Sequence, residues 1–266
     1  MIRDITIGQY YPVDSFVHRL DPRVKITATA AYVICLFVFS GIYCYALMVI
    51  GLMCVLKMSR VPLGYVMKGL RPVLFLLIFT IIINMLFVSG EHMLVEWAFI
   101  HISLEGVINA AYLTARLILL IIGSSLQTFT TTPAQLTDGL ERIFAPLKIL
   151  RLPVHEIAMM MSIALRFIPI LVEEADKVMK AQQARGADFE SGNLIERTKS
   201  LVPVLVPLFV GAFRRASDLA MAMEARCYRG QEGRSKFKPL KYERRDYFAY
   251  AVTAAGIVLL RVVKRL

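Results

Sequence analysis

Residues Val107–Phe129 read VINAAYLTARLILLIIGSSLQTF, a stretch of 23 residues in which Arg116 is the only charged side chain. A helix needs about 20 predominantly apolar residues to cross the hydrocarbon core of a bilayer. This stretch is long enough to do so. It therefore predicts a transmembrane helix, and the other apolar runs of the chain can be compared with it.

Four other apolar runs approach the same length. They lie at about Ile26–Ser40, Tyr43–Leu56, Val73–Ser89 and Tyr247–Val263. The composition agrees with a membrane protein, because 57% of the residues are hydrophobic, 19% are charged and the mean hydropathy is +0.60. The first two runs are short and are joined by Gly41-Ile42, which favours a tight helical hairpin. We predict an all-α integral membrane protein with about five transmembrane helices.

The charges between these runs predict the orientation of the chain. Residues 1–25 contain four lysines or arginines, and residues 57–71 contain four more with no acid. Residues 90–105 contain Glu91, Glu96 and Glu105 and no lysine or arginine. The positive-inside rule therefore makes the first two segments cytoplasmic and the third external. Residues 128–245, with 19 basic and 13 acidic side chains, are expected in the cytoplasm. Five crossings would place the basic C-terminus outside, so the last crossing and the side of the C-terminus stay open.

Several functional classes are excluded by the composition. The net charge of +11 is spread over loops beside apolar helices, where it favours contact with anionic lipid rather than nucleic acid. The four cysteines and four histidines show no metal-ligand spacing, and His155-Glu156 lacks a second histidine at Met159. No phosphate-binding loop is present, so we expect this chain to bind no ATP or other cofactor itself. We predict no catalytic residue and no metal site.

The long segment before the last apolar run predicts three cytoplasmic helices. They run from about Pro133 to Lys148, from Pro153 to Arg185 and from Asn193 to Cys227. The second and third are long, and only about Ala187–Gly192 separates them, so we expect them to cross as a pair. The predicted domains are residues 1–129 with four transmembrane helices, residues 130–232 with the long crossed helices, and residues 233–266 with a linker and the last transmembrane helix.

The third of these helices has an uncharged centre, Leu201–Phe213. Its 13 residues would span about 20 Å as a helix, less than the ~30 Å of a hydrocarbon core. We therefore expect it to lie beneath the bilayer or in its interface. A real crossing is the alternative.

The same six-residue phrase ends both long helices. Residues 181–186 read AQQARG, residues 222–227 read AMEARC, and the two arginines, Arg185 and Arg226, lie 41 positions apart. One arginine at a helix C-terminus is explained by the helix dipole alone. The repeat of the whole phrase favours docking, because small neighbours let a helix tip enter a groove where a guanidinium can reach a carboxylate. We expect the far ends of the two helices to present these arginines to two similar sockets on a partner.

The chain resembles the T components (EcfT/CbiQ-type membrane subunits) of energy-coupling factor (ECF) transporters. The resemblance rests first on the two motifs, Ala184-Arg185-Gly186 and Ala225-Arg226-Cys227, of which the second has cysteine in place of glycine. It rests next on an N-terminal signature, which consists of Gly8-Gln9-Tyr10, Ser15 and His18-Arg19-Leu20-Asp21-Pro22-Arg23-Val24-Lys25. The order of predicted helices matches over nearly the whole chain.

The resemblance implies a scaffold that acts with partners. In this family two ABC ATPases (EcfA-type), which bind the ATP, dock on the cytoplasmic helices, and a separate S component binds the vitamin or metal ion. The two motifs would be the ATPase-docking residues. The setting would be a prokaryotic cell membrane, with the coupling helices in the cytoplasm. The substrate is selected by the S component and cannot be deduced from this chain.

Two further sites are candidates. Asp21 and Pro22 suit the start of a helix, as cap and first-turn residue, and the family signature gives them and Arg23 additional weight. Arg116 is the one charge well inside a predicted crossing, and such a cation is costly in a membrane. It is expected either to bond to carbonyls or hydroxyls such as that of Thr114, or to face a partner.

Three other functional classes fit the sequence less well. A stand-alone secondary transporter would need carboxylates at the midplane and an internal repeat, and neither is visible. A membrane-embedded enzyme would need a nucleophile or metal cluster near the interface. A conventional ABC permease subunit is closer, but it would present one coupling motif rather than two.

Overall fold

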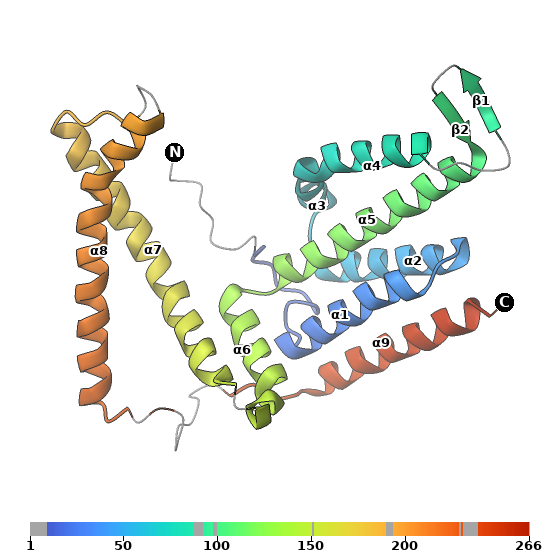
Figure 1. Cartoon of the computed structure of the whole chain (residues 1–266). Coiled ribbons are helices and arrows are strands. Elements are labelled where there is room, and N and C mark those ends of the chain that lie inside the picture. Colours follow the sequence, from blue (N-terminus) through green and yellow to red (C-terminus); the bar gives the residue numbers. More distant parts are fainter. Residues whose placement is uncertain are drawn as a thin grey trace. The chain divides into compact units, whose positions relative to one another are not determined.

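The computed structural model describes residues 10–87, 93–97, 100–150, 152–189, 194–228, 230 and 239–265. The described residues form two compact units. We call the residues up to Gly139, together with those from Leu240 onward, the bundle unit. Residues from Leu140 to Pro239 form the paired-helix unit. Figure 1 shows both, and each is described separately.

The bundle unit is built around the long helix α5, Leu104–Thr130. Its other helices are α1 (Pro22–Val38), α2 (Ile42–Ser59), α3 (Leu63–Leu70), α4 (Leu74–Phe87) and α9 (Arg244–Val263). Helix α5 contacts α1, α2, α3 and α4, and α9 packs on α1 and α2. Gly41 joins α1 and α2 with a backbone φ of +127° that suits glycine, as a short connection requires. The two helices pack on α5 and α9 rather than closely on each other, so the predicted tight helical hairpin is not found.

The third predicted crossing starts earlier than expected. Helix α3 begins directly after Pro62, and a 3-10 turn at Arg71–Val73 connects it to α4. The region 57–71, predicted as a loop, is therefore mostly helical. Pro62 lies just before the helix, where proline is favourable. Pro72 lies in the 3-10 turn, and the chain continues directly from it into α4. Leu63–Met85 form one apolar span of 23 residues.

A short β-hairpin precedes α5. Strand β1 (Met93–Trp97) pairs antiparallel with β2 (Ile100–Ser103). This hairpin was not predicted. Its strands are short, and residues 90–105 were considered only as an acidic connection on the external side. Glu91 of that connection lies outside the described residues.

The core of the bundle unit lies where α1, α2 and α5 meet. Its most buried apolar side chains include Leu36, Cys44 and Phe129. Tyr32 packs against α5 at Gly123, where an added Cβ would lie only 2.4 Å from the tyrosine ring. The Tyr32 hydroxyl donates to the carbonyl of Leu119 at 3.2 Å. Glycine at this position therefore lets α1 and α5 approach closely.

Helix α6, Pro133–Phe144, contributes residues to both units. It starts as predicted, at Pro133 after a hydroxyl cap. The Gln135 N–H donates to the Thr132 hydroxyl at 3.3 Å, and the Thr132 N–H donates to the Gln135 side-chain oxygen at 3.1 Å. A 3-10 helix, Ala145–Leu150, follows it, so α6 is shorter than predicted.

The paired-helix unit consists mainly of α7, Val154–Ala184, and α8, Leu194–Ala225. Both helices were predicted within a few residues. Three contacts show that they run antiparallel along their length (Figure 1). Gln182 donates to the carbonyl of Pro203 at 3.5 Å, Arg215 lies 2.6 Å from Glu174, and the Tyr228 hydroxyl lies 3.2 Å from the Met159 sulfur.

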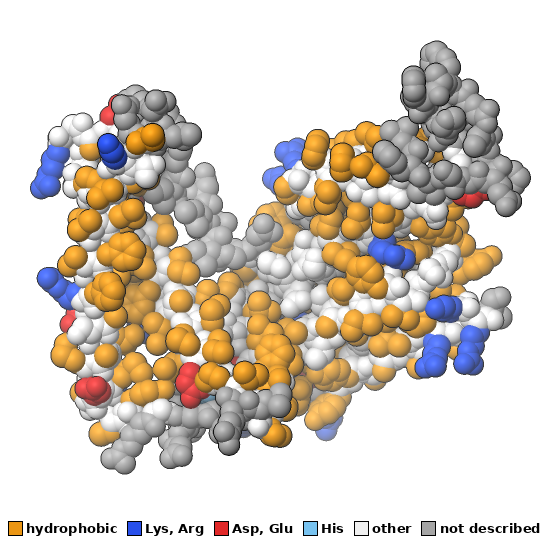
Figure 2. Space-filling view, viewed as in Figure 1, with side chains coloured by type: hydrophobic (Ala, Val, Ile, Leu, Met, Phe, Trp, Pro, Cys, Tyr) orange, Lys and Arg blue, Asp and Glu red, His pale blue; other side chains and the backbone are white. Residues whose placement is uncertain are grey.

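Six helices of the described part are long and apolar enough to cross a membrane. They are α2, Leu63–Met85, α5, α7, Thr198–Ala225 of α8, and α9. Helix α1 is shorter than these, with 17 residues. Large apolar side chains are exposed over both units, as Figure 2 shows. The predicted fold class, an all-α integral membrane protein, is confirmed. Among the described residues, six helices rather than about five are long and apolar enough to cross; they include α7 and α8, which were predicted as cytoplasmic, and do not include α1.

Candidate functional site

The first motif forms the end of α7. The Gly186 N–H donates to the carbonyl of Gln183 at 2.9 Å, and the Ala187 N–H donates to the carbonyl of Gln182 at 3.0 Å. Gly186 has a φ of +89°, in the left-handed region. This pair of bonds around a left-handed residue is the Schellman motif, which satisfies the last carbonyls of a helix. Arg185 is the C-cap residue.

The second motif forms the same structure at the end of α8. The Cys227 N–H donates to the carbonyl of Glu224 at 2.8 Å, and the Tyr228 N–H donates to the carbonyl of Met223 at 3.0 Å. Cys227 has a φ of +58°. Each partner lies 41 positions after its counterpart in α7. The repeated sequence therefore encodes a repeated helix end, with Arg226 in the place of Arg185.

The arginines of both motifs are exposed. The three residues of the first motif, Ala184, Arg185 and Gly186, are exposed, and so are Ala225, Arg226 and Cys227 of the second. Within the part of the chain that the structure describes, neither guanidinium forms a hydrogen bond or an ion pair. Each helix thus ends in a cation with free donors between small neighbours.

The antiparallel pairing separates the two motifs. Arg185 lies near the Gln182–Pro203 contact, whereas Arg226 lies near the Met159–Tyr228 contact. Along α7 these contacts are 23 residues apart, or about 35 Å at 1.5 Å per residue. The two arginines therefore stand at opposite ends of the pair. The pair itself was predicted, but the expectation that the far ends of both helices present the arginines was wrong, because Arg185 lies near the start of α8 and Arg226 lies near the start of α7.

An ion pair holds the middle of the two helices together. Glu174 and Arg215 lie 2.6 Å apart, with 28% and 34% of their side chains exposed. Gly211 makes room for the carboxylate, since an added Cβ there would lie 3.1 Å from its oxygen. An apolar cavity of about 310 Å³ lies beside the ion pair and is lined by residues such as Phe167 and Leu219. This ion pair was not predicted from the sequence, because its two residues lie on different helices.

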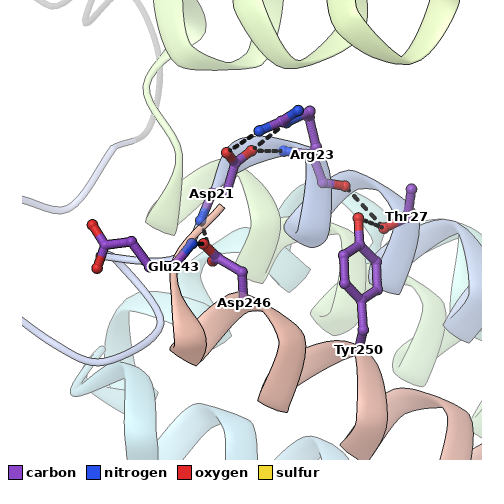
Figure 3. A network of polar contacts seen from close by, with 6 residues as sticks. All are labelled: Asp21, Arg23, Thr27, Glu243, Asp246 and Tyr250. Carbon is purple, nitrogen blue, oxygen red and sulfur yellow. Dashed lines mark hydrogen bonds and ion pairs between the residues drawn. The ribbon is translucent and has the colours of Figure 1, made fainter. Parts of the chain in front are cut away.

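The family signature forms a buried polar cluster in the bundle unit (Figure 3). The Asp21 carboxylate accepts from the Arg23 backbone N–H at 2.9 Å, and the Arg23 guanidinium donates to both carboxylate oxygens at 3.0 and 2.8 Å. The Arg23 guanidinium also lies 3.7 Å from the centroid of the Tyr242 ring. Asp21 therefore caps α1, with Pro22 in its first turn, as predicted. Gly8 and Gln9 of the signature lie outside the described residues.

Asp246 ties the start of α9 to the start of α1. One of its carboxylate oxygens accepts from the Asp21 N–H at 2.9 Å, and the other accepts from the Glu243 N–H at 2.8 Å. The Asp246 side chain is buried. This residue was not predicted from the sequence, because 225 positions separate it from Asp21. The spacing of Glu243 and Asp246, which resembles a capping box, was the available signal.

Lys25 fixes a third helix end in the same region. Its Nζ donates to the carbonyl of Thr130, the last residue of α5, at 2.7 Å, and to the carbonyl of His18 at 3.0 Å. A cation at a helix C-terminus is stabilised by the helix dipole. The signature residues therefore join the ends of α1, α5 and α9, which are distant in the sequence.

Arg116 bonds to a side chain of another helix. Its Nε donates to the hydroxyl of Tyr45 on α2 at 2.8 Å. A hydroxyl partner was one of the predicted possibilities, although it comes from Tyr45 rather than from a residue such as Thr114. Among the described residues, no group of three or more histidines, cysteines or carboxylates is placed to hold a metal ion.

Comparison with known proteins gives one consistent result. Residues 14–237 match the CbiQ family, described as cobalt transport protein. The energy-coupling factor transporter transmembrane protein EcfT of Clostridium kluyveri is 49% identical over 267 residues, which cover 100% of this chain and 98% of that protein. EcfT of Ruminiclostridium cellulolyticum is 51% identical, with 95% of this chain and 94% of that protein covered. EcfT of Bacillus subtilis is 45% identical, with 98% and 100% covered.

These relatives match nearly the whole chain, in agreement with the resemblance first suggested by the paired arginine motifs and the N-terminal signature. The helices of the structure agree with a multi-pass membrane subunit. The chain therefore belongs to the EcfT/CbiQ family, the transmembrane T components of energy-coupling factor transporters.

Proposed function

We propose that this chain is the non-catalytic scaffold that couples two ABC ATPases to a substrate-binding S component for the uptake of a vitamin or metal ion. The observation that supports it best is the repeated helix end. Two exposed arginines, Arg185 and Arg226, stand in the same backbone setting at the two ends of one helix pair. Two equivalent tips suit two equivalent sockets, one on each ATPase, and the ATP belongs to those partners.

The paired-helix unit would lie on the cytoplasmic side of a prokaryotic cell membrane. The excess of basic residues in 128–245 supports this placement by the positive-inside rule. Helices α7 and α8 are long and apolar enough to cross a membrane, but each of them ends in polar residues and prolines interrupt both. Their exposed apolar side chains, such as Phe209 and Phe213, would contact the S component or the membrane interface.

Docking would rest on a charge-assisted contact. A guanidinium offers a fixed fork of donors that matches a carboxylate. The small alanines beside Arg185 and Arg226 would let each helix end enter a groove on an ATPase. The Schellman turn ends the helix directly after the arginine, so the chain turns away from that groove. Truncation of one partner of a buried charge pair costs about 2–5 kcal/mol. Two such contacts would hold the ATPases firmly.

When the two ATPases close on ATP, the helix pair would move as one body and pass this movement toward the membrane. The Glu174–Arg215 ion pair and the contacts at both ends hold α7 and α8 along their length. Packed elements of this kind shift as units. Helix α6 offers a path onward, because Gly139 fits closely against Pro22 in the bundle unit, while Glu141 accepts a bond from His155 of α7 at 2.9 Å in the paired-helix unit.

Co-purification with the ATPases tests this function. We would express the chain with its candidate ABC ATPases and compare the wild type with Arg185→Ala/Arg226→Ala. The matched control is Arg166→Ala/Arg214→Ala, which removes one exposed arginine from the middle of each helix. We expect the ATPases to be lost only with the tip variant, and each single tip variant to weaken recovery.

Equal recovery with the tip variant and the control would place the contact elsewhere on the helices. Recovery of no ATPase even with the wild type would favour a stand-alone transporter. That alternative is checked directly by substrate uptake into vesicles that contain the chain without ATPases.

A further inference from the structure

A polar cavity of about 470 Å³ lies in the bundle unit, where α1 turns into α2 and α4 approaches α5. Its polar lining residues are Ser40, Tyr45, Asn84, Asn109, Tyr112 and Arg116. The lining includes one cation and no carboxylate. None of these residues belongs to the docking motifs or to the cluster around Asp21, so the proposed function leaves the cavity unused.

Arg116 is held in a fixed position at this cavity. Its Nε donates to the Tyr45 hydroxyl at 2.8 Å, and its guanidinium carbon lies 5.7 Å from the centroid of the Phe37 ring. A guanidinium has five N–H donors, and this bond uses one of them. For the other four, the described part of the chain provides no hydrogen bond or ion pair. The Tyr45 hydroxyl accepts from Arg116, so its own proton stays free to be donated.

An anion in the cavity would satisfy this donor set. Arg116 belongs to α5, an apolar helix that can span a membrane, but it lies level with the α1–α2 connection, because Ser40 and Gly41 line the same cavity. An unpaired cation beside apolar helices is costly. The forked donors of arginine match phosphate oxygens, and the tyrosine hydroxyl adds a further donor. The volume of the cavity lies within the usual range for small-ligand sites.

The surroundings indicate that the anion is carried on a lipid. Ile42 and Tyr43 follow the lining residue Gly41, and Ile108 precedes the lining residue Asn109. Their exposed fractions are 65%, 77% and 45%. Such apolar surface suits acyl chains rather than a free ion in water. A second cation, Lys264, donates to the carbonyl of Val38 at 3.0 Å and so lies at the same α1–α2 connection. Two cations near one helix connection attract the phosphate of an anionic lipid by charge complementarity.

The geometry points to a site for the phosphate group of an anionic phospholipid, bound by Arg116 and Tyr45 between α2, α4 and α5. The test is lipid retention by the purified full-length chain in nanodiscs of phosphatidylcholine with a minor fraction of phosphatidylglycerol. Native mass spectrometry then counts the phosphatidylglycerol molecules that stay bound. The variants are Arg116→Gln, which removes the charge, and Tyr45→Phe, which keeps the ring and removes only the hydroxyl.

We expect the wild type to retain phosphatidylglycerol in preference to phosphatidylcholine. Arg116→Gln should weaken this retention by about tenfold, since it removes a charge-assisted contact. Tyr45→Phe, the milder change, should weaken it by a smaller factor. The matched control is Arg261→Gln, which removes an exposed cation near Lys264 outside the cavity, and it should retain the lipid within about a factor of two.

Three results would overturn the assignment. Equal retention by the wild type and both cavity variants would remove the site. Equal loss with Arg261→Gln would show general charge attraction instead of a cavity. Displacement of the lipid by inorganic phosphate alone at millimolar concentration would show that the cavity takes a free oxyanion rather than a phospholipid.

Discussion

Gly186 and Cys227 occupy equivalent positions one residue beyond the arginines that end α7 and α8, and both have a left-handed backbone, with φ of +89° and +58°. Glycine adopts this conformation freely, whereas a residue with a Cβ is strained in it by about 1–2 kcal/mol. The single departure from the repeated motif therefore changes the stability of a helix end and leaves its shape intact. Nothing in the structure explains why cysteine stands at this position.

The two helix ends should respond to substitution in opposite directions. Cys227→Gly should stabilise the end of α8 by about 1 kcal/mol, and Gly186→Ala should destabilise the end of α7 by a similar amount. Hydrogen exchange at the amides of Ala187 and Tyr228 reports on each end separately. A helical glycine without positive φ, Gly64, serves as the control, and Gly64→Ala should leave both ends unchanged. Equal exchange in all variants would contradict the strain at Cys227.

Breaking the ion pair between α7 and α8 should loosen the helix pair. Glu174→Ala leaves Arg215 without its partner, and because both side chains are about one-third exposed we expect a loss of only about 1 kcal/mol. Glu173→Ala, at the exposed neighbouring position, is the matched control. Chemical denaturation of the purified chain measures the difference. If coupling depends on the pair, ATP-driven uptake should fall with Glu174→Ala and not with Glu173→Ala.

Asp246→Asn should destabilise the bundle unit. The carboxylate accepts from two backbone N–H groups with its two oxygens, whereas an amide has only one acceptor oxygen and would turn its NH2 group toward the other N–H. A buried donor left without a partner costs about 1–3 kcal/mol. Thermal denaturation in detergent should show a lower midpoint than for Asp218→Asn, an exposed change on α8. Equal midpoints would mean that water replaces the lost acceptor.

Acidification should weaken the segment before α1. Burial lowers the pKa of His18 below the 6.5 of a free histidine, and the nearby Lys25 adds to this effect. The folded chain therefore binds fewer protons than the unfolded chain, and the stability from this residue is complete above pH 6.5 and falls as the pH drops through the folded pKa. His18→Gln cannot titrate, so its stability should fall less than that of the wild type between pH 7.5 and 5.5.

The His18 hydrogen bonds identify the neutral form of the ring that burial favours. Nε2 lies 3.0 Å from the carbonyl of Tyr11, which can only accept, so Nε2 carries the proton. Nδ1 lies 2.7 Å from the Ser15 hydroxyl, which then donates to it. Protonation of Nδ1 would remove that acceptor. An identical pH dependence for the wild type and His18→Gln would contradict this arrangement.

The sequence predicted what local patterns determine. Apolar runs located α1, α2, α4, α5 and α9 because the length of a crossing is a simple physical requirement. The pairs Thr132-Pro133 and Asp21-Pro22 marked helix starts through capping chemistry. The repeated ends of α7 and α8 were visible because a Schellman turn depends on residues next to one another. The docking role of Arg185 and Arg226 stays a prediction.

Contacts between distant residues could not be predicted. Asp21 and Asp246, Arg116 and Tyr45, and Glu174 and Arg215 are each brought together by packing, which a single sequence does not reveal. The early start at Leu63 was missed because the four basic side chains of residues 57–71 were interpreted as those of a connection between crossings. The predicted domain boundary at residues 232 and 233 lies outside the described residues.

The antiparallel course of α7 and α8 gives the paired-helix unit an approximate two-fold symmetry. Rotation by half a turn about an axis across the middle of the pair, close to the Glu174–Arg215 contact, would exchange the end that carries Arg185 with the end that carries Arg226. A partner that is itself a two-fold dimer would meet both tips in the same orientation. One asymmetric chain can thus present matched contacts to the two subunits of a symmetric partner. The difference between Gly186 and Cys227 would let it distinguish two unlike subunits.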